Sequence, residues 1–286
     1  MLETHEEMGS SMKVLVVTTF HKEGMDVYGQ RFIDTFSKNV DPKIDLRVYA
    51  ENCDPVVNDP YDRIAVFSAE TNLDKLQAFK QKWKGVPKAN GKCPPDIKAR
   101  RPRDWHKEFK WDAVRFANKV YAVFHACESD QYDLVVWMDA DTVCHSPISH
   151  EKFISFFPTN TWLSYLGRGN KWPECGFYGI HINNTAGKQF LKDFERAYED
   201  AERGIFTMEE WHDSYVFDEV LKKVRVAYPQ INDLSGHLVK GEGHPLINCE
   251  LGAYFDHLKG ARKKDGISRK KDLFKVRKED YWKNVK

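Results

Sequence analysis

The chain has 286 residues and a mass of 33.4 kDa, and 41% of its residues are hydrophobic and 13% aromatic. This apolar content excludes a wholly disordered chain, and the length predicts one large α/β domain or two fused subdomains. The net charge is +1, but residues 80–110 and residues 259–286 carry +8 each, which leaves −15 for the other 227 residues. This asymmetry indicates an anionic partner, although a solvated loop and a solvated tail would have the same composition.

The predicted elements alternate between strands and helices along the chain. Strands are predicted at 13–19, 44–50, 63–67, 133–138, 162–166 and 177–182, because these runs are β-branched or alternate in polarity. Helices are predicted from their apolar stripes at 26–38, 72–83, 111–126, 185–203 and 214–223. Residues 84–104 combine Pro, Gly and many cations, which predicts a loop. The order of these elements predicts an α/β layered sheet.

Several protein classes and locations are excluded or favoured by what the chain lacks. It has no run of about 18 apolar residues, so no membrane-spanning helix is expected. Residues 1–11 contain three glutamates and no apolar core, so they are interpreted as a disordered leader or a vector-derived remnant and not as a secretory signal. None of the six cysteines forms a CxxC pair, which argues against a zinc ribbon and predicts reduced thiols in a cytoplasmic protein.

The strongest chemical signal is a pair of carboxylates at the end of a buried strand. Five apolar residues, 134–138, lead directly into Asp139-Ala140-Asp141. Ligands of open α/β sheets bind at the carboxyl ends of strands. Residues at i and i+2 of an extended chain point the same way, so both carboxylates can face one cation. Hard oxygen ligands suit Mg²⁺ or Mn²⁺. The alternative is a pair of capping or turn aspartates.

This carboxylate pair resembles motifs of two enzyme families. In GT-A glycosyltransferases, a D-x-D motif holds a divalent ion against the diphosphate of a nucleotide-sugar. In haloacid-dehalogenase (HAD) phosphatases, an apolar strand ends in D-x-D-x-T, which also matches Asp139 to Thr142. The phosphatase resemblance would make Asp139 the nucleophile and Asp141 the acid/base. That motif normally opens its domain, whereas here more than a hundred residues of α/β sequence precede it, so the glycosyltransferase interpretation is favoured.

The region near the C-terminus supports the same interpretation. Residues 256–263 resemble the H-x-x-G-x-x-K signature of retaining GT-A enzymes such as the glycogenin-like family. The resemblance implies that His257 is the third metal ligand, that Gly260 lets the backbone approach the phosphates, and that Lys263 neutralises the diphosphate. A departure from the family pattern follows, because Lys264 and Asp265 stand where Pro-Trp is usual. The alternative role of His257 is that of an ordinary surface histidine.

Other segments resemble the nucleotide-binding parts of GT-A enzymes. The helix before the D-x-D motif often supplies an arginine to the nucleotide-sugar, which makes Arg115 a candidate, although it would equally fit an exposed basic stripe with Trp111 and Lys119. The end of the first strand holds the base and ribose in this fold, which implies binding roles for Thr18, Thr19 and Phe20.

Two further segments resemble the part of GT-A enzymes that contacts the transferred sugar. Residues 174–179 resemble the glycine-containing segment that lines the donor sugar, so Glu174 and Gly176 are site candidates. Residues 211–214 resemble the W-H-D-E stretch of the blood-group-type retaining transferases, whose catalytic carboxylate occupies the fourth position. Here that position is Ser214, so Asp213 becomes the candidate, as a sugar-binding group, a base or a helix cap.

Taken together, the resemblance implies a GT-A, Rossmann-like three-layer α/β/α sandwich at residues 12–264 with a basic tail at 265–286. It implies a glycosyltransferase that depends on Mn²⁺ or Mg²⁺ and moves a sugar from a nucleotide-diphosphate sugar to a hydroxyl acceptor. The sequence as a whole resembles phage-encoded glycosyltransferases. A UDP-sugar donor and retention of configuration are favoured, and the acceptor is a glycan or a modified nucleic acid. The alternatives are the HAD-type phosphatase and a nucleic-acid-binding protein that uses the basic segments. A DNA-modifying glycosyltransferase would combine two of these functions.

Overall fold

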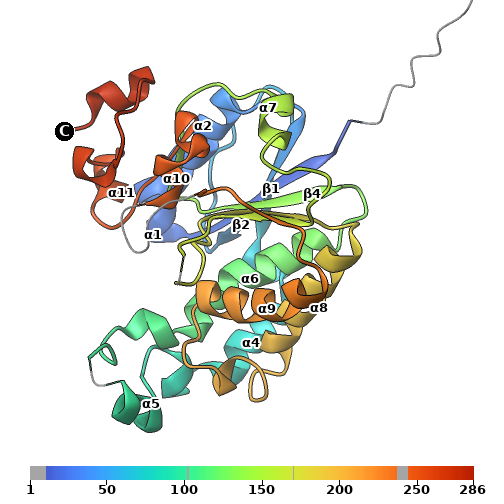
Figure 1. Ribbon diagram of the computed structural model, residues 1–286, viewed down its shortest axis with the longest axis vertical. Helices are drawn as coiled ribbons and strands as arrows, with labels where there is room; N and C mark the ends of the chain where they lie inside the picture. The colour runs from blue at the N-terminus through green and yellow to red at the C-terminus, as the bar shows by residue number, and fades with distance from the viewer. Residues whose placement is uncertain (1–10, 102, 170, 237–243) are drawn as a thin grey trace, which may run out of the picture.

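The computed structural model describes residues 11–101, 103–169, 171–236 and 244–286 (Figure 1), so the predicted leader lies outside the described residues except for Ser11. A seven-stranded sheet runs through the molecule in the order β3-β2-β1-β4-β7-β6-β8, and all its strands are parallel except β7. The α/β class and the mainly parallel sheet are therefore confirmed. The strands are β1 (Val14–His21), β2 (Ile44–Glu51), β3 (Ile64–Ser68), β4 (Leu134–Met138), β6 (Leu163–Tyr165), β7 (Phe177–His181) and β8 (Ile231–Asp233).

Helices cover both faces of this sheet and enclose a separate hydrophobic core on each (Figure 1). One face carries α4 (Asp74–Trp83), α6 (Ala113–Cys127), α8 (Thr185–Glu199) and α9 (Asp213–Ala227). The other carries α2 (Gln30–Asn39), α7 (His150–Ile154) and α10 (Pro245–Asn248). Shorter elements are α1 (Lys22–Gly24), a π-helix (Met25–Gly29), α3 (Ala69–Asn72), α5 (Pro95–Arg100), α11 (Arg262–Asp265) and 3₁₀ turns at 87–89, 108–111, 205–207, 250–253, 270–272 and 280–284.

The alternation of side chains along the strands explains why there are two cores. In β1, Val14 and Val16 join the core under α2, whereas Leu15 and Val17 join the core under α6. Successive strand residues point to opposite faces, and a strand that is apolar at every position is therefore buried on both. Among the described residues, no helix combines the length and the apolar character that crossing a membrane requires.

The strand order reverses next to β1, and this reversal determines where a ligand crevice opens. From β1 the chain moves outward to β2 and β3, then returns to β4 on the other side of β1. In open α/β sheets, ligands bind outside the carboxyl ends of the strands at such a switch point. The carboxyl ends of β1 and β4 carry Phe20 and Asp139, two of the predicted site residues.

A second, two-stranded sheet joins the D-x-D segment to the C-terminal region. Strands β5 (Thr142–Cys144) and β9 (Phe255–His257) pair antiparallel, with Thr142 opposite His257. The amide of Leu258 also donates to the carbonyl of Asp141 at 2.9 Å. These backbone contacts, which join residues more than a hundred positions apart, fix the histidine beside the aspartates.

Two segments predicted to be irregular have more structure than expected. The loop prediction for 84–104 was wrong for residues 95–100, which form α5, because Pro95 is well suited to the first turn of a helix. Residues 265–286 pack onto the domain. Trp282 is buried and donates its Nε1 hydrogen to the carbonyl of Gly252 at 2.7 Å. Asp256 accepts hydrogen bonds from the Tyr281 hydroxyl at 2.8 Å and from Ser268.

Candidate metal centre

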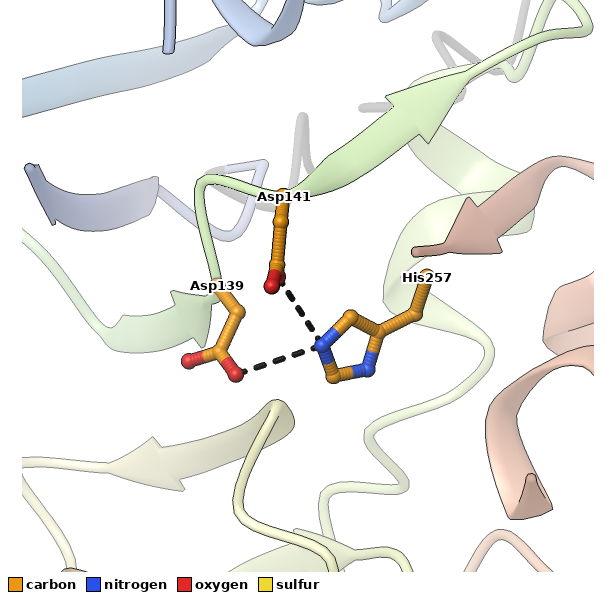
Figure 2. Close-up of side chains that lie close together, drawn as sticks. All are labelled: Asp139, Asp141 and His257. Carbon is orange, nitrogen blue, oxygen red and sulfur yellow. Dashed lines mark ion pairs between the residues drawn. The ribbon is translucent and has the colours of Figure 1, made fainter. Parts of the chain in front are cut away.

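Two carboxylates and an imidazole converge at the switch point (Figure 2). Nε2 of His257 lies 2.9 Å from Oδ1 of Asp141 and 3.3 Å from Oδ2 of Asp139. One ligand atom from each residue lies within 4.8 Å of the other two. No other group of three His, Cys, Asp or Glu side chains meets this condition in the part of the chain that the structure describes. The sequence prediction that these three residues belong together agrees with this geometry.

The backbone around the aspartates explains their orientation. The amide of Asp139 donates to the carbonyl of Gly176 at 2.9 Å, and the amide of Thr142 donates to the carbonyl of Asp139 at 3.0 Å. The chain therefore turns between Asp139 and Thr142, and both carboxylates face β9. At Gly176, a Cβ atom would lie only 2.2 Å from Cε1 of His257. Glycine is required at this position because the imidazole passes so close to the backbone.

Lysine and tryptophan side chains hold the other oxygens of the two carboxylates. Nζ of Lys119 lies 3.1 Å from Oδ1 of Asp139, and the same oxygen accepts a hydrogen bond from Nε1 of Trp137 at 2.7 Å. Nζ of Lys263 lies 2.7 Å from Oδ2 of Asp141. Each carboxylate thus has one oxygen bound to a cation and one oxygen turned toward His257. The two inner oxygens and Nε2 form the donor set.

The charges in this cluster stabilise one another. Burial lowers the pKa of His257, but the neighbouring Asp141 and Asp139 carboxylates outweigh it and raise this pKa to about 9. Burial favours a neutral Asp139, but Lys119 and His257 hold its pKa far below the ordinary value. Burial likewise opposes the charge of Lys119, whereas Asp139 and Asp213 raise its pKa well above the usual range. A protonated His257 therefore lies between the carboxyl groups of Asp139 and Asp141.

The donor set fits a divalent cation. Oδ1 of Asp141 and Nδ1 of His257 are buried and, apart from the ion pair of this Oδ1 with Nε2 of His257, have no polar partner of hydrogen-bond geometry among the described residues. Such orphaned atoms are costly unless a further ligand or a water satisfies them. Two carboxylate oxygens suit Mg²⁺ and Mn²⁺ alike, whereas an imidazole nitrogen is a better ligand for a transition metal than for Mg²⁺. The residues present therefore fit Mn²⁺ better than Mg²⁺.

A cavity of about 950 Å³ opens beside the donor set at the carboxyl ends of β1 and β4. This volume is in the range of small-molecule sites in proteins. Its wall is rich in cations, which are Lys80, Lys84, Arg115, Lys119 and Lys263. Six of the residues predicted from the sequence line it, namely Thr19, Phe20, Arg115, Asp139, Asp141 and Lys263.

Three other predicted residues stand away from this cavity. Thr18 is fully buried, and its side chain does not line the cavity. Gly260 has a φ of +57° with open space around it, so the left-handed conformation is what requires glycine there. Glu174 is buried and paired with Lys259 and, at 3.3 Å, with Arg168. Burial favours the neutral acid, but Lys259, His257 and Arg168 lower its pKa to about 2.

Asp213 is linked to the donor set through a lysine. Its Oδ2 lies 2.8 Å from Nζ of Lys119, the same ammonium group that contacts Asp139. Asp213 is the first residue of α9, but its side chain does not cap the helix. The cap is His212, whose Nδ1 accepts a hydrogen bond from the amide of Tyr215 at 3.3 Å. The helix-cap alternative for Asp213 is therefore wrong, and its contact is with the charged centre.

Sequence reasoning did not assign a site role to four nearby residues. Lys119 lies one turn beyond Arg115 on the same helix, and that spacing was the available signal. Trp137 is the penultimate residue of β4, and Tyr28 lies beneath the Lys263 ammonium, whose Nζ is 5.0 Å from the ring centroid. His244 is buried with its ring centroid 4.4 Å from that of His257. No sequence pattern indicated Tyr28 or His244.

The chain matches no protein-family model and no curated protein sequence. The functional interpretation therefore rests on the geometry of the site and on the motif resemblance.

Proposed function

We propose that this protein is a metal-dependent GT-A glycosyltransferase, which moves a sugar from a nucleotide-diphosphate sugar to a hydroxyl acceptor. The observation that carries the proposal is the donor set of Asp139, Asp141 and His257, with Lys263 against it, at the edge of a cation-lined cavity. A nucleotide diphosphate is an anion, so its charge is complementary to the cations that line this cavity. A UDP-sugar is the donor we favour, and Mn²⁺ is the metal.

In the proposed reaction, a bond forms between the acceptor oxygen and C1 of the sugar, and the bond from C1 to the diphosphate oxygen breaks. The acceptor loses its proton and the nucleoside diphosphate leaves. A bound divalent ion supplies Lewis-acid stabilisation of the diphosphate. Lys263 lies beside Asp141 and would oppose the negative charge that develops on the leaving group, as preorganised cations do. Arg115 lines the same cavity and would bind the donor phosphates or ribose.

The position of Asp213 supports a role near the transferred sugar. It is buried and joined by Lys119 to the candidate metal ligand Asp139. In the proposed enzyme it would bind a sugar hydroxyl or stabilise positive charge on the sugar, and retention of configuration remains our expectation. Glu174 is less suited to direct catalysis, because two cations, Arg168 and Lys259, already neutralise it, whereas Asp213 contacts the single ammonium group of Lys119.

The phosphatase alternative requires Asp139 to attack a phosphate with a free carboxylate oxygen. Instead, Oδ1 of Asp139 contacts Lys119 and Trp137, and Oδ2 faces His257. This geometry favours a ligand over a nucleophile. The acceptor of the proposed transferase is a glycan or a modified nucleic acid.

A thermal-shift screen tests the proposal, because a ligand that binds the folded state raises the melting temperature. We expect UDP to raise it in the presence of Mn²⁺ and to have little effect in EDTA. Asp141→Asn should abolish the Mn²⁺-dependent shift, and the exposed control Asp130→Asn should retain it. A shift with inorganic phosphate and a metallofluoride, without any shift with nucleotides, would instead support the phosphatase.

A further inference from the structure

Residues 82–101 and 103–109 form a surface on which cations and aromatic rings are both exposed. We call it the 82–109 surface. Trp105 is 40% exposed and Phe109 is 41% exposed, whereas most aromatic rings of the protein are buried. Of its exposed cations, Arg100 pairs with Asp96 and Glu209, whereas six others have no carboxylate partner among the described residues, namely Lys82, Lys84, Lys92, Lys98, Arg103 and Lys107.

Internal contacts hold this surface in one shape. Nζ of Lys110 lies 2.8 Å from Asp104 and 2.8 Å from Glu210, and Arg101 contacts the same two carboxylates. These buried or half-buried cations neutralise the acidic groups of the region and fix the segment to the start of α9. The amide of Gly91 also donates to the carbonyl of Trp111 at 3.0 Å. The unpaired cations are therefore carried by an ordered support.

The surface continues into the cavity described above. Lys84 belongs to the 82–109 surface and also lines the cavity. Beneath the surface, the buried His212 ring packs 5.5 Å from the ring of Phe109 and 6.0 Å from the ring of Phe116, which lines the cavity. A polymer bound on the surface would thus reach the rim of the cavity at Lys84.

We infer that the 82–109 surface binds single-stranded nucleic acid, and that a nucleotide of this strand supplies the acceptor hydroxyl. Proteins that bind single strands combine a cationic track for the phosphates with exposed rings on which bases stack. A neutral glycan would leave the cations without a partner. An acidic membrane is a poorer match, because the apolar groups here are two rings among cations and not an aliphatic face. The cavity volume of about 950 Å³ is that of a small-molecule site, so we infer that an acceptor base enters it unpaired, as a single nucleotide.

The acceptor role rests on the proposed function, whereas the binding itself does not. In the transfer step, the oxygen of the nucleotide hydroxyl forms the bond to C1 of the sugar and loses its proton, and the bond from C1 to the diphosphate oxygen breaks. Binding is therefore measured in EDTA without any donor. Single-strand binding by the unaltered protein, together with no Mn²⁺-dependent UDP binding by that same protein, would remove the proposed function and keep the surface.

The test is fluorescence anisotropy with a labelled single-stranded oligonucleotide of about 20 nucleotides across a series of salt concentrations. We expect the affinity to fall steeply with salt. The variant Lys98→Glu/Arg103→Glu/Lys107→Glu should weaken binding at least about tenfold and flatten the log–log salt slope by about 2, because each lost phosphate contact removes about 0.7. The matched control reverses three exposed cations elsewhere, Lys270→Glu/Lys271→Glu/Lys275→Glu, and should bind as the unaltered protein does.

Two substitutions of Trp105 test whether bases of the single strand stack on its ring. Trp105→Ala should weaken single-strand binding about fivefold or more, and Trp105→Phe should restore most of it. A duplex of the same sequence should bind less tightly than the single strand. The inference is overturned if the two triple variants lose affinity equally, if the duplex binds as tightly, or if phosphatidylserine vesicles bind through this surface and the oligonucleotide does not.

Discussion

The two basic segments of the chain have the same net charge and hold it in different ways. In the C-terminal segment, many of the cations form ion pairs: Lys259 contacts Glu174, Arg262 contacts Asp272 and Lys263 contacts Asp141. On the 82–109 surface, six exposed cations have no carboxylate partner in the described part of the chain, and Arg100 is the exposed cation that has one. The first segment thus helps to build the candidate metal centre, and the second leaves most of its exposed charge available to the partner that we propose.

Aromatic residues separate the two segments in the same way. Trp282 of the C-terminal segment is 5% exposed and packs beside His145, whereas Trp105 of the 82–109 surface is 40% exposed. A buried ring contributes to the stability of the fold, whereas the partly exposed Trp105 ring, which has the Lys98 ammonium 3.8 Å from its centroid, retains surface for contact. Net charge alone does not distinguish these roles, but burial and ion pairing do.

The largest effect that we predict concerns Asp141, which both His257 and Lys263 contact. Asp141→Asn should lower sugar transfer on the order of 10³-fold, because the lost ligand charge removes several kcal/mol of transition-state stabilisation. The measurement is the release of UDP from a panel of UDP-hexoses at fixed Mn²⁺. Asp130→Asn should retain full activity. Equal rates in the two variants at saturating Mn²⁺ would show that Asp141, and the contact that Lys263 of the C-terminal segment makes with it, do not contribute to catalysis.

Replacing one tryptophan in each segment tests whether the C-terminal segment contributes more to the stability of the fold than the 82–109 surface does. Trp282→Ala should lower the free energy of unfolding by about 3–5 kcal/mol, because it empties a buried site and leaves the Gly252 carbonyl without its donor. Trp105→Ala should change it by less than about 0.5 kcal/mol. Urea denaturation of both variants measures the difference. Similar losses in the two variants would show that both segments are structural.

The close approach of Gly176 to His257 gives a prediction for metal affinity. Gly176→Ala should lower Mn²⁺ affinity about 10–100-fold, since the added Cβ displaces the imidazole. The control is Gly179→Ala, in which the Cβ would lie 2.2 Å from Phe157 and no metal ligand is involved. Both variants should be destabilised, but only Gly176→Ala should lose metal affinity in a calorimetric titration. An equal loss in the control would attribute the effect to general unfolding.

A smaller effect is the dependence of metal affinity on pH. The pKa of His257 is raised to about 9 in the metal-free protein, so below this pH the imidazole must lose a proton before its nitrogen can bind Mn²⁺. Affinity should therefore fall by about tenfold for each unit as the pH decreases from 9 to 7. Calorimetry in buffers of different ionisation enthalpy should show about one proton released. A constant affinity over this range would contradict the bridging role of the protonated histidine.

Much of the fold followed from local sequence pattern. The long strands β1, β2 and β4 and the helices α6 and α8 were predicted close to their observed bounds, because each is long enough to display its period. Strands β5, β8 and β9 have three residues each and were not predicted, since so short a run shows no periodicity. The packing of the C-terminal segment was also missed, because Tyr281 and Trp282 stand among charged residues that indicate exposure.

The candidate site likewise contains some residues that the local sequence predicted and others that it did not. Asp139 and Asp141 follow an apolar strand, and His257 lies in a motif with fixed spacing, so local sequence was sufficient to nominate them. Lys119 was passed over in favour of Arg115, because two cations one turn apart on a helix cannot be ranked without knowing where β4 ends. Tyr28 and His244 reach the site only through tertiary packing. The residues that flank Tyr28 and His244 in the sequence form no pattern that indicates a site.

The central claim is that Asp139, Asp141 and His257 hold one divalent cation. Electron paramagnetic resonance of free Mn²⁺ tests it most directly, because the sharp signal of the aqueous ion is lost on binding. We predict one Mn²⁺ bound per chain, tighter binding when UDP is added, and strongly weakened binding in Asp141→Asn and in His257→Ala, with Asp130→Asn unchanged. Mn²⁺ binding that is absent in the unaltered protein, or equal in the ligand variants and the control, would contradict the account.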